Sequence, residues 1–294
     1  MSSSAPPISI VIPHYNDLVS LGRCLDAIDA QTVPRERYEV IVADNASPVG
    51  LDAVEALVAG RARVVLVTER GAGAARNGGV AVAAGEILAF TDCDCLPEPG
   101  WLDAGVRALD RYGLVGGRMT VLVDDPNHMT PAEAFEMVFA FDNRDYVLRK
   151  HFTVTANLFV RKADFDRVGP YRGAVSEDVD WCLRARACGL QIGYVEEAAV
   201  GHPARRTWPE LERKWLRITS EEHALTMERP RGALRWAIKA AMLPPSALAH
   251  LPKVLTSPKL NNRRDRLAAA AVLVRSRLLR SRESFRLLLA RSGV

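Results

Sequence analysis

The chain has 294 residues, of which 48% are hydrophobic and 25% charged, values typical of a soluble globular protein long enough to bury a full core. No uninterrupted stretch reaches the ~20 apolar residues that span a bilayer, and residues 1–7 lack the basic and apolar segments of a secretory signal. The net charge of +4 conceals a split between −9 over the first 228 residues and +13 thereafter, because 15 of the 39 basic but 2 of the 35 acidic residues lie from Arg229 onward.

The uneven charge distribution and the cysteines indicate which kind of partner and which cellular compartment to expect. A basic segment on an acidic chain indicates an anionic partner, either a membrane or a nucleic acid. The five cysteines are odd in number and scattered, and Cys93-x-Cys95 is too short for the usual half of a zinc site. We therefore expect reduced thiols and a cytoplasmic location.

Three apolar runs in the first quarter of the chain predict strands, the first of which we expect to be buried. They are Ile8–Ile12, which Pro13 ends, Tyr38–Ala43 and Arg63–Val67. Apolar residues at helical spacing between them predict helices, the second of which covers about Leu51–Ala59. Strands that alternate with helices at this pace indicate the α/β class, a mostly parallel sheet flanked by helices.

Polar side chains follow three of the predicted strands. Tyr15 and Asp17 follow the first strand, and Asp44 follows the second. Asp92 and Asp94 follow a fourth apolar run. Because ligands of such sheets bind outside the carboxyl ends of the strands, we expect these side chains to lie at one edge.

The fourth run, Ile87–Cys95, carries two carboxylates one residue apart. Alternation along an extended backbone points Asp92 and Asp94 the same way and Cys93 the opposite way. Two like charges on one face repel, and a hard divalent cation that bridges to substrate phosphates would relieve them. The alternative is a pair of solvated acids at the end of a strand.

A glycine-rich segment, Gly71–Gly79, opens a helix rich in alanine and valine. Such a turn can cradle phosphates, although the segment matches neither the dinucleotide fingerprint nor the Lys-Ser/Thr phosphate loop. Close packing of the helix explains the small residues equally well. Arg76 would place a positive charge near the phosphate site.

The middle of the chain contains mixed elements. We predict helices over Glu98–Tyr112 and Lys162–Val168, and strands over Leu114–Val123 and Thr153–Arg161. Residues 124–150 are polar and aromatic without a clean period. They form either a flexible active-site flap or a surface insertion.

Three acids begin the next predicted helix. Glu177, Asp178 and Asp180 complement the dipole of this helix, so they either only start it or include a general base. A strand is predicted over Leu190–Val195, and His202 follows it in a loop. A lone histidine in a loop is more often structural or solvated than a ligand.

Taken in order, short motifs between Ile8 and about His202 resemble family 2 glycosyltransferases of the GT-A fold, which invert the anomeric carbon of the transferred sugar. The resemblance covers about two-thirds of the chain. The motifs are Ile10-Val11-Ile12-Pro13-His14-Tyr15-Asn16, Val42-Ala43-Asp44-Asn45-Ala46-Ser47, Ala75-Arg76-Asn77-Gly78, Asp92-Cys93-Asp94, Ala156-Asn157, Glu177-Asp178 and His202. One departure is Glu69-Arg70-Gly71, where the family often has Asn-x-Gly.

The resemblance implies a role for each of these positions. Asp94, with Asp92, matches the Asp-x-Asp pair that holds the ribose and the metal, and His202 lies where some members place a metal ligand. Asp178, in the pair with Glu177, matches the catalytic base. The positions implied to bind the nucleotide sugar are Pro13, Tyr15, Asn16, Asp44, Arg76, Asp92 and Asn157.

The resemblance thus implies an inverting glycosyltransferase that uses Mn²⁺ or Mg²⁺ and a UDP-linked donor. It would act on a glycan or lipid-linked acceptor in polysaccharide biosynthesis. One alternative is a sugar nucleotidyltransferase, whose glycine-rich signature with a following Arg and Lys is not supplied by His14-Tyr15-Asn16. A non-catalytic nucleotide-sugar-binding scaffold is disfavoured by the intact acids at 92, 94 and 178.

We expect a catalytic domain over residues 1–206 and a basic helical extension over residues 207–294. Trp208–Met227 predicts a helix, a proline-interrupted apolar run follows, and Arg266–Arg291 predicts a basic amphipathic helix. Such a helix is typical of proteins on anionic membranes, so we expect peripheral binding at the inner face and no nucleic acid partner. Packing on the catalytic body and an oligomer contact are the alternatives.

Overall fold

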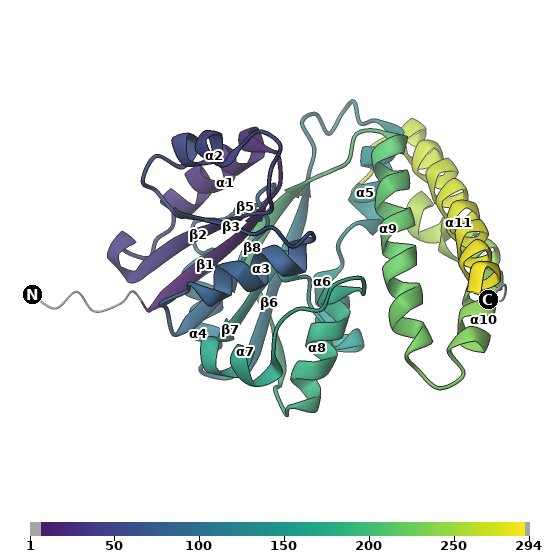
Figure 1. Ribbon diagram of the computed structural model, residues 1–294. Helices are drawn as coiled ribbons and strands as arrows, with labels where there is room; N and C mark the ends of the chain where they lie inside the picture. Colours follow the sequence, from purple (N-terminus) through teal and green to yellow (C-terminus); the bar gives the residue numbers. More distant parts are fainter. Residues whose placement is uncertain (1–6, 292–294) are drawn as a thin grey trace, which may run out of the picture. The chain divides into compact units, whose positions relative to one another are not determined.

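The computed structural model describes residues 7–291 and contains an eight-stranded sheet (Figure 1). The strands lie in the order β3-β2-β1-β4-β7-β6-β8-β5. They are β1 Ile8–His14, β2 Tyr38–Asp44, β3 Arg63–Leu66, β4 Ile87–Phe90, β5 Leu96–Pro97, β6 Leu114–Leu122, β7 Leu158–Arg161 and β8 Ile192–Pro203. Strands β3, β2, β1 and β4 pair in parallel, whereas β7 is antiparallel to both β4 and β6. The predicted α/β class is confirmed.

The chain divides into two compact units. The sheet unit comprises residues up to 120, 142–173 and 177–202, and the helical unit comprises 121–141, 174–176 and 203 onward. The boundary expected at residue 206 stays a prediction, because each unit gathers more than one stretch of sequence. The larger helices of the sheet unit are α1 Leu18–Asp29, α2 Leu51–Val58, α3 Ala72–Ala81, α4 Trp101–Ala108, α7 Lys162–Val168 and α8 Glu177–Ala187.

The register of the parallel strands aligns their carboxyl ends. Val11 in β1 is level with Ile41 in β2 and with Phe90 in β4. His14 is level with Asp44, so the residues that leave β1 and β2 meet at one edge of the sheet. This alignment follows from the buried apolar runs, because a slip of one residue would turn every core side chain to the other face.

The small residues of α3 serve helix packing. Helix α3 lies against β1 and β2 (Figure 1). A Cβ atom at Gly79 would lie 2.6 Å from Cγ1 of Val11, so only glycine allows this approach. At the start of the helix, a Cβ atom at Gly73 would lie 2.5 Å from Oε2 of Glu177. The glycine-rich segment thus lets the helix approach both the sheet and an acidic side chain.

Two predicted strands differ from the observed ones. Strand β4 ends at Phe90, and Asp92 and Asp94 lie in the following turn, in which the amide of Cys95 donates to the carbonyl of Asp92. The expectation that an extended backbone points both carboxylates the same way is therefore wrong. Only Leu158–Arg161 of the strand predicted from Thr153 is extended, because a 3₁₀ turn, η3 Thr155–Asn157, precedes it.

Other predicted bounds also shift. The segment without a period contains α5 Pro131–Phe139, begun by a capping box at Thr130, and the short α6 Asn143–Asp145 and η2 Tyr146–Lys150. Strand β8 continues to Pro203, so His202 lies at the end of a strand and not in a loop. Pairing of β8 with β5, Leu96 level with Gly201, extended this strand beyond the apolar run from which it was predicted.

The helical unit packs around its own core. Its long helices are α9 Trp208–Met227, α10 Gly232–Leu255 and α11 Arg263–Arg291. Helix α10 runs through its three prolines and packs along α11, while α11 also contacts α5 and α9. Phe135, Leu211 and Leu273 belong to the buried apolar cluster. Within it, the carboxylate of Glu136 is paired with Lys214 and Arg205.

Candidate active site

The carboxyl ends of β1 and β2 are joined by a buried polar network. Nδ1 of His14 lies 2.8 Å from Oδ1 of Asp44, and both side chains are buried. Ser47 donates to the same carboxylate from its hydroxyl, at 2.5 Å, and from its amide, at 3.0 Å. The hydroxyl of Ser47 accepts the amide of Asn16 at 2.8 Å, so the loops after the two strands hold each other.

The pKa of Asp44 reflects this network. Burial alone would raise the pKa of the carboxyl group, but the hydrogen bonds from Ser47 and His14 outweigh it and hold the pKa below its ordinary value. Asp44 is 1% exposed, so its role is to hold the two loops together. In the first of these loops, Tyr15 is 59% exposed, and Asn16 is exposed with a positive φ of 53°. Contact between these residues and a nucleobase stays a prediction.

Arg76 connects two acidic segments of the chain, the second of which begins at Glu177, 101 residues from Arg76 in the sequence. From α3, its buried guanidinium contacts Oδ1 of Asp92 at 2.5 Å and Oε1 of Glu177 through the other terminal nitrogen. The ring of Tyr171 lies 6.0 Å from the guanidinium carbon. The turn after β4 and the start of α8 therefore meet at one cation.

The charges in this bridge shift one another's pKa values. Burial raises the pKa of Glu177 above its ordinary value, and the opposing effect of Arg76 does not fully compensate, because Asp178 and Asp92 add like charge. Burial favours the neutral form of Arg76, but Asp92, Glu177 and Asp178 raise its pKa well above the ordinary value. Arg76 is therefore a permanent cation between carboxylates.

The three acids at the start of α8 have different surroundings. Glu177 contacts Arg76, as described above. Asp180 is buried and accepts hydrogen bonds from Arg172 and Arg184, at 3.0 Å from the Nε of each. Asp178 is partly exposed, and its Oδ1 accepts both the amide of Thr155, at 2.9 Å, and the hydroxyl of that residue.

The carboxylate of Asp94 and the imidazole of His202 form a second pair in the same unit. Oδ2 of Asp94 lies 3.3 Å from Nε2 of His202, a contact made possible by the pairing of β8 with β5. Carboxylates are typical ligands of Mn²⁺ and Mg²⁺, whereas imidazole is more typical of Zn²⁺. A site with only two protein ligands leaves coordination positions for the phosphate oxygens of a substrate. Over residues 7–291, no group of three or more His, Cys, Asp or Glu side chains forms a metal site.

Asn157 and Pro13 are two further predicted site residues, and both are buried. The amide of Asn157 accepts from Trp101 at 3.0 Å and donates to the carbonyls of Arg118, at 3.0 Å, and Ala198, at 2.9 Å. Pro13 lies within β1. Direct contact of Asn157 with a nucleotide sugar stays a prediction, and its fully used amide fits a role in joining strands better.

Sequence reasoning did not single out several residues of this site. Thr155 immediately precedes the Ala156-Asn157 motif, and its hydroxyl gave no signal until the fold placed it beside Asp178. His14 and Ser47 lie inside the matched motifs without a role of their own. Their adjacency to Asp44 could have been inferred only from the register of β1 and β2.

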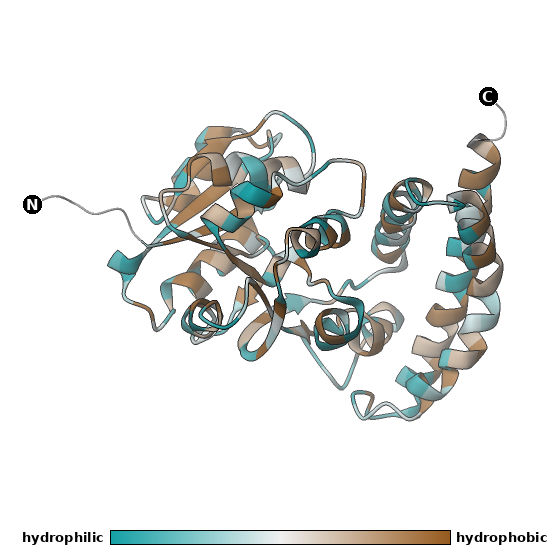
Figure 2. Cartoon of the chain, turned by 90° about the horizontal axis from the view of Figure 1, so that it is seen from below, coloured by the Kyte–Doolittle hydropathy of each residue, from teal (hydrophilic) through white to brown (hydrophobic). Residues whose placement is uncertain are grey.

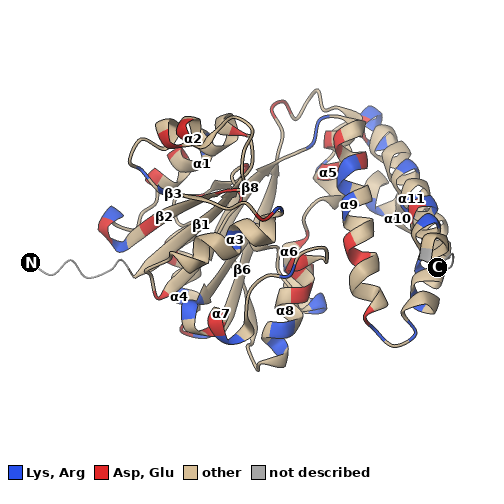
Figure 3. Ribbon diagram, in the orientation of Figure 1, with Lys and Arg blue, Asp and Glu red and all other residues tan. Residues whose placement is uncertain are grey.

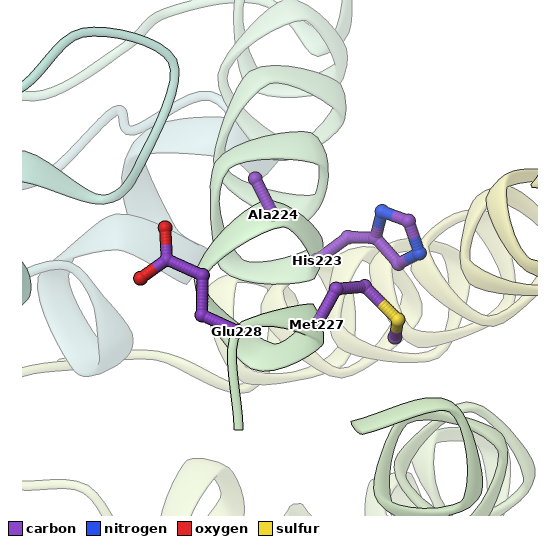
Figure 4. A pocket seen from close by; sticks show the side chains of 4 residues that line it. All are labelled: His223, Ala224, Met227 and Glu228. Carbon is purple, nitrogen blue, oxygen red and sulfur yellow. The ribbon is translucent and has the colours of Figure 1, made fainter. Parts of the chain in front are cut away.

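A hollow of about 340 Å³ lies elsewhere, at the end of α9 (Figure 4). His223, Ala224, Met227 and Glu228 line it. In Figure 4, His223 and Met227 point to one side of the helix and Glu228 to the other, so no chemical groups converge there. None of the residues predicted from the sequence lines this hollow.

Comparisons with known proteins complete the description. Residues 9–169 match the family described as Glycosyl transferase family 2. The chain is 33% identical over 226 residues to Glycosyltransferase AglE of Haloferax volcanii, covering 74% of this chain and 73% of that protein. It is 28% identical over 214 residues to the pre-mycofactocin glycosyltransferase of Mycobacterium tuberculosis, covering 68% of this chain and 44% of that protein. The solved mannosyltransferase PcManGT from Pyrobaculum calidifontis, in complex with GDP-Man and Mn²⁺, shares the fold with a TM-score of 0.58 at 20% identity, over 92% of this chain and 87% of that one.

Proposed function

Because this chain belongs to glycosyl transferase family 2, and is therefore an enzyme that transfers a sugar from a nucleotide sugar, we propose that it inverts the anomeric carbon and uses Asp178 as general base. The observation that carries the proposal is the bridge through Arg76. It joins the turn that holds Asp92 and Asp94 to the residue before Asp178. An acidic turn for the donor and a separate carboxylate for the acceptor are what such a transfer requires.

We propose that the donor lies along the carboxyl ends of β1, β2 and β4. The exposed Tyr15 and Asn16 would contact the nucleobase, while Asp44 keeps their loop in place. Asp94 and His202 would hold Mn²⁺ or Mg²⁺, which when bound supplies positive charge beside the diphosphate. Two carboxylates already neutralise Arg76, so we assign it the positioning of these segments in place of direct contact with phosphate.

The chemistry follows from the position of the base. The acceptor hydroxyl attacks the anomeric carbon from the face opposite the diphosphate, and the new bond forms as the bond to the diphosphate oxygen breaks. The leaving nucleoside diphosphate takes the electron pair of that bond. Asp178 takes the hydroxyl proton, which makes the attacking oxygen a better nucleophile. A single displacement of this kind inverts the anomeric centre and needs no covalent intermediate.

The activity is tested first without the natural acceptor. The purified protein is incubated with Mn²⁺ and either UDP-glucose or GDP-mannose, and release of UDP or GDP to water is measured. GDP-mannose is included because the structural relative holds GDP-Man. Cleavage of one of the two donors would identify the nucleobase that the enzyme accepts. If neither these donors nor other nucleotide sugars were cleaved with Mn²⁺ or Mg²⁺, the result would count against the proposal.

The role of Asp178 is tested by Asp178→Asn, with Asp166→Asn on α7 as the control. Asp166 is exposed and forms an ion pair with Lys162 on its own helix. Loss of a general base lowers turnover by about 10²–10⁴-fold, whereas the control should keep full turnover. Calorimetry should find nucleotide affinity unchanged in both variants. Full turnover in Asp178→Asn would remove this residue from the role.

We further propose that the helical unit binds an anionic membrane surface from the cytoplasmic side, which would bring the enzyme to a lipid-linked acceptor. Basic residues outnumber acidic ones along α10 and α11 (Figure 3), and apolar turns alternate with polar ones (Figure 2). Over residues 7–291, no helix is long and apolar enough to cross a bilayer. Binding would therefore be peripheral.

Exposed apolar side chains on both helices follow helical spacing. On α10 they include Leu234, Ile238 and Met242, each more than half exposed, and α11 presents a longer stripe. The stripe on α11 comprises Leu267, Val274, Leu278, Phe285 and Leu289. Arg264, Arg275, Arg282 and Arg286 lie among these positions on α11 and are also exposed. Apolar side chains among arginines match a negatively charged lipid surface, where each basic residue adds ~1 kcal/mol.

Vesicle sedimentation tests this surface. The protein is mixed with phosphatidylcholine vesicles with and without phosphatidylglycerol, and Leu278→Glu is compared with Leu66→Glu, whose leucine in β3 is equally exposed at 50% against 54%. We expect binding only to the anionic vesicles, and its loss in Leu278→Glu but not in Leu66→Glu. Equal binding by the two variants, or concentration-dependent dimers that only Leu278→Glu dissolves, would contradict the membrane assignment.

A further inference from the structure

The hydrogen bonds of Asp178 distinguish its two oxygens. Oδ1 accepts the amide of Thr155 at 2.9 Å and also the hydroxyl of the same residue. Within residues 7–291, Oδ2 accepts no hydrogen bond and forms no ion pair. One oxygen is thus occupied by two donors from a single residue, and the other is open.

Thr155 is held firmly in this position. It is 1% exposed and begins η3, the 3₁₀ turn that ends at Asn157. Asn157 is fully buried, and its amide joins Trp101 and two backbone carbonyls. Because the turn spans only three residues, these contacts also fix the donors of Thr155. The fully buried amide of Asn157 thus supports the residue that contacts the base.

We propose that Thr155 is a positioning residue for the general base, an inference that rests on the proposed function. Its two donors hold Oδ1 of Asp178 and turn Oδ2 toward the acceptor hydroxyl. Thr155 therefore sets the direction of the base without touching the substrate.

Other charged groups also face Asp178. Arg76 attracts its negative charge, whereas Glu177 adds like charge from the preceding position. The phenol of Tyr171 and the thiol of Cys182 lie close enough to interact with it. Of these groups, Tyr171 also interacts with the side chain of Thr155, so the test follows the carboxyl group of Asp178 itself.

The test compares Thr155→Val, Thr155→Ser and the matched control Thr219→Val. Valine keeps the shape and the backbone amide of threonine but removes the hydroxyl, and serine restores it. Thr219, in α9, is a buried threonine whose hydroxyl has no hydrogen-bond partner among residues 7–291, so its replacement measures the effect of losing a buried hydroxyl. Urea unfolding of all three variants identifies any that fails to fold.

The first readout needs no substrate. The protein is labelled with ¹³C at the aspartate carboxyl groups, the Asp178 signal is assigned by its loss in Asp178→Asn, and its chemical shift is measured by NMR. We expect the signal to move in Thr155→Val, because the carboxylate loses the hydroxyl donor, and to return in Thr155→Ser. The control should not move it. An unmoved signal in a folded Thr155→Val would overturn the inference.

The second readout is cleavage of UDP-glucose or GDP-mannose with Mn²⁺. In Thr155→Val we expect kcat to fall by about tenfold and KM to stay constant. Thr155→Ser should restore most of the rate. An unchanged kcat in a folded Thr155→Val, or no rescue by Thr155→Ser, would overturn the positioning role. Absence of cleavage by the wild-type protein would instead overturn the proposed function, and the NMR signal would still decide the contact.

Discussion

Arg76→Met is the most direct perturbation of the bridge between the donor turn and α8. Methionine keeps an apolar stem of similar length but removes the guanidinium, so the carboxylates of Asp92 and Glu177 lose their shared cation. The arginine side chain is 4% exposed, whereas those of Asp92 and Glu177 are 31% and 24% exposed. The two acids therefore remain close together in a site that water reaches only in part.

The expected loss of stability follows from these exposures. Breaking a buried ion pair by removing one partner costs about 3–5 kcal/mol, because a charge is left without compensation. Asp92 and Glu177 can recover part of their hydration, so we expect the free energy of unfolding to fall by about 2–3 kcal/mol at pH 7. Arg76→Lys should recover only part of this, because a lysine cannot contact two carboxylates in the same fork geometry.

The pH dependence gives a second, independent expectation. The pKa of Glu177 is higher in the folded protein than in the unfolded chain. Ionisation of Glu177 therefore lowers the stability of the fold as the pH rises from the unfolded-state pKa through the folded-state pKa. Without Arg76, which lowers that pKa, the cost grows. The deficit of Arg76→Met should therefore be larger at pH 7 than at pH 5, where more of the carboxyl groups carry a proton.

Urea unfolding followed by tryptophan fluorescence at both pH values measures this deficit. The control is Arg107→Met, because Arg107 is 73% exposed and pairs with Asp103, one turn away on α4. We expect no measurable loss in the control. If Arg76→Met lost no more stability than the control at pH 7, or lost more at pH 5 than at pH 7, the reasoning about the bridge would be refuted.

Three further predictions concern other parts of the sheet unit. Ser47→Ala removes a donor that helps to lower the pKa of Asp44. The lowered pKa stabilises the fold at neutral pH, and this stabilisation is lost as Asp44 is protonated on acidification. Acid unfolding of the variant, followed by circular dichroism, should therefore begin at a higher pH. Gly105→Ala should lower the free energy of unfolding in urea by about 1–3 kcal/mol, because the added Cβ would overlap the ring of Phe159. Asp94→Ala should abolish the increase in nucleotide affinity on adding Mn²⁺ in calorimetry. An unchanged acid midpoint, an unchanged urea midpoint or a persistent manganese effect would contradict the respective prediction.

Much of the fold can be predicted from local patterns in the sequence. Ile8–Ile12 and Tyr38–Ala43 were predicted as strands from their β-branched runs and were observed with their carboxyl ends two residues and one residue further on. The helix over Lys162–Val168 was observed with the predicted bounds. Such patterns act over a few residues, through the backbone preferences of the side chains and the period of burial, and so they can be found in one sequence.

Bounds set by pairing with distant strands were predicted less well. His202 was expected in a loop, but pairing of β8 with β5 keeps the backbone extended as far as Pro203. The turn of Asp92 and Asp94 was expected to be extended because an apolar run precedes it, yet pairing with β7 ends at Phe90. In each case a partner remote in sequence decided where the strand ends.

By itself, the sequence determined the chemistry of the site, since it placed carboxylates, an arginine and a histidine after strands whose ends must meet. Only the tertiary structure decided what each of these groups contacts. In the structure, Asp180 forms ion pairs with Arg172 and Arg184, and Glu177 forms one with Arg76. The physical reason is that neighbouring acids on a helix share the same local preferences, whereas their partners come from segments brought close only by the register of the sheet and the packing of α3 and α8 upon it.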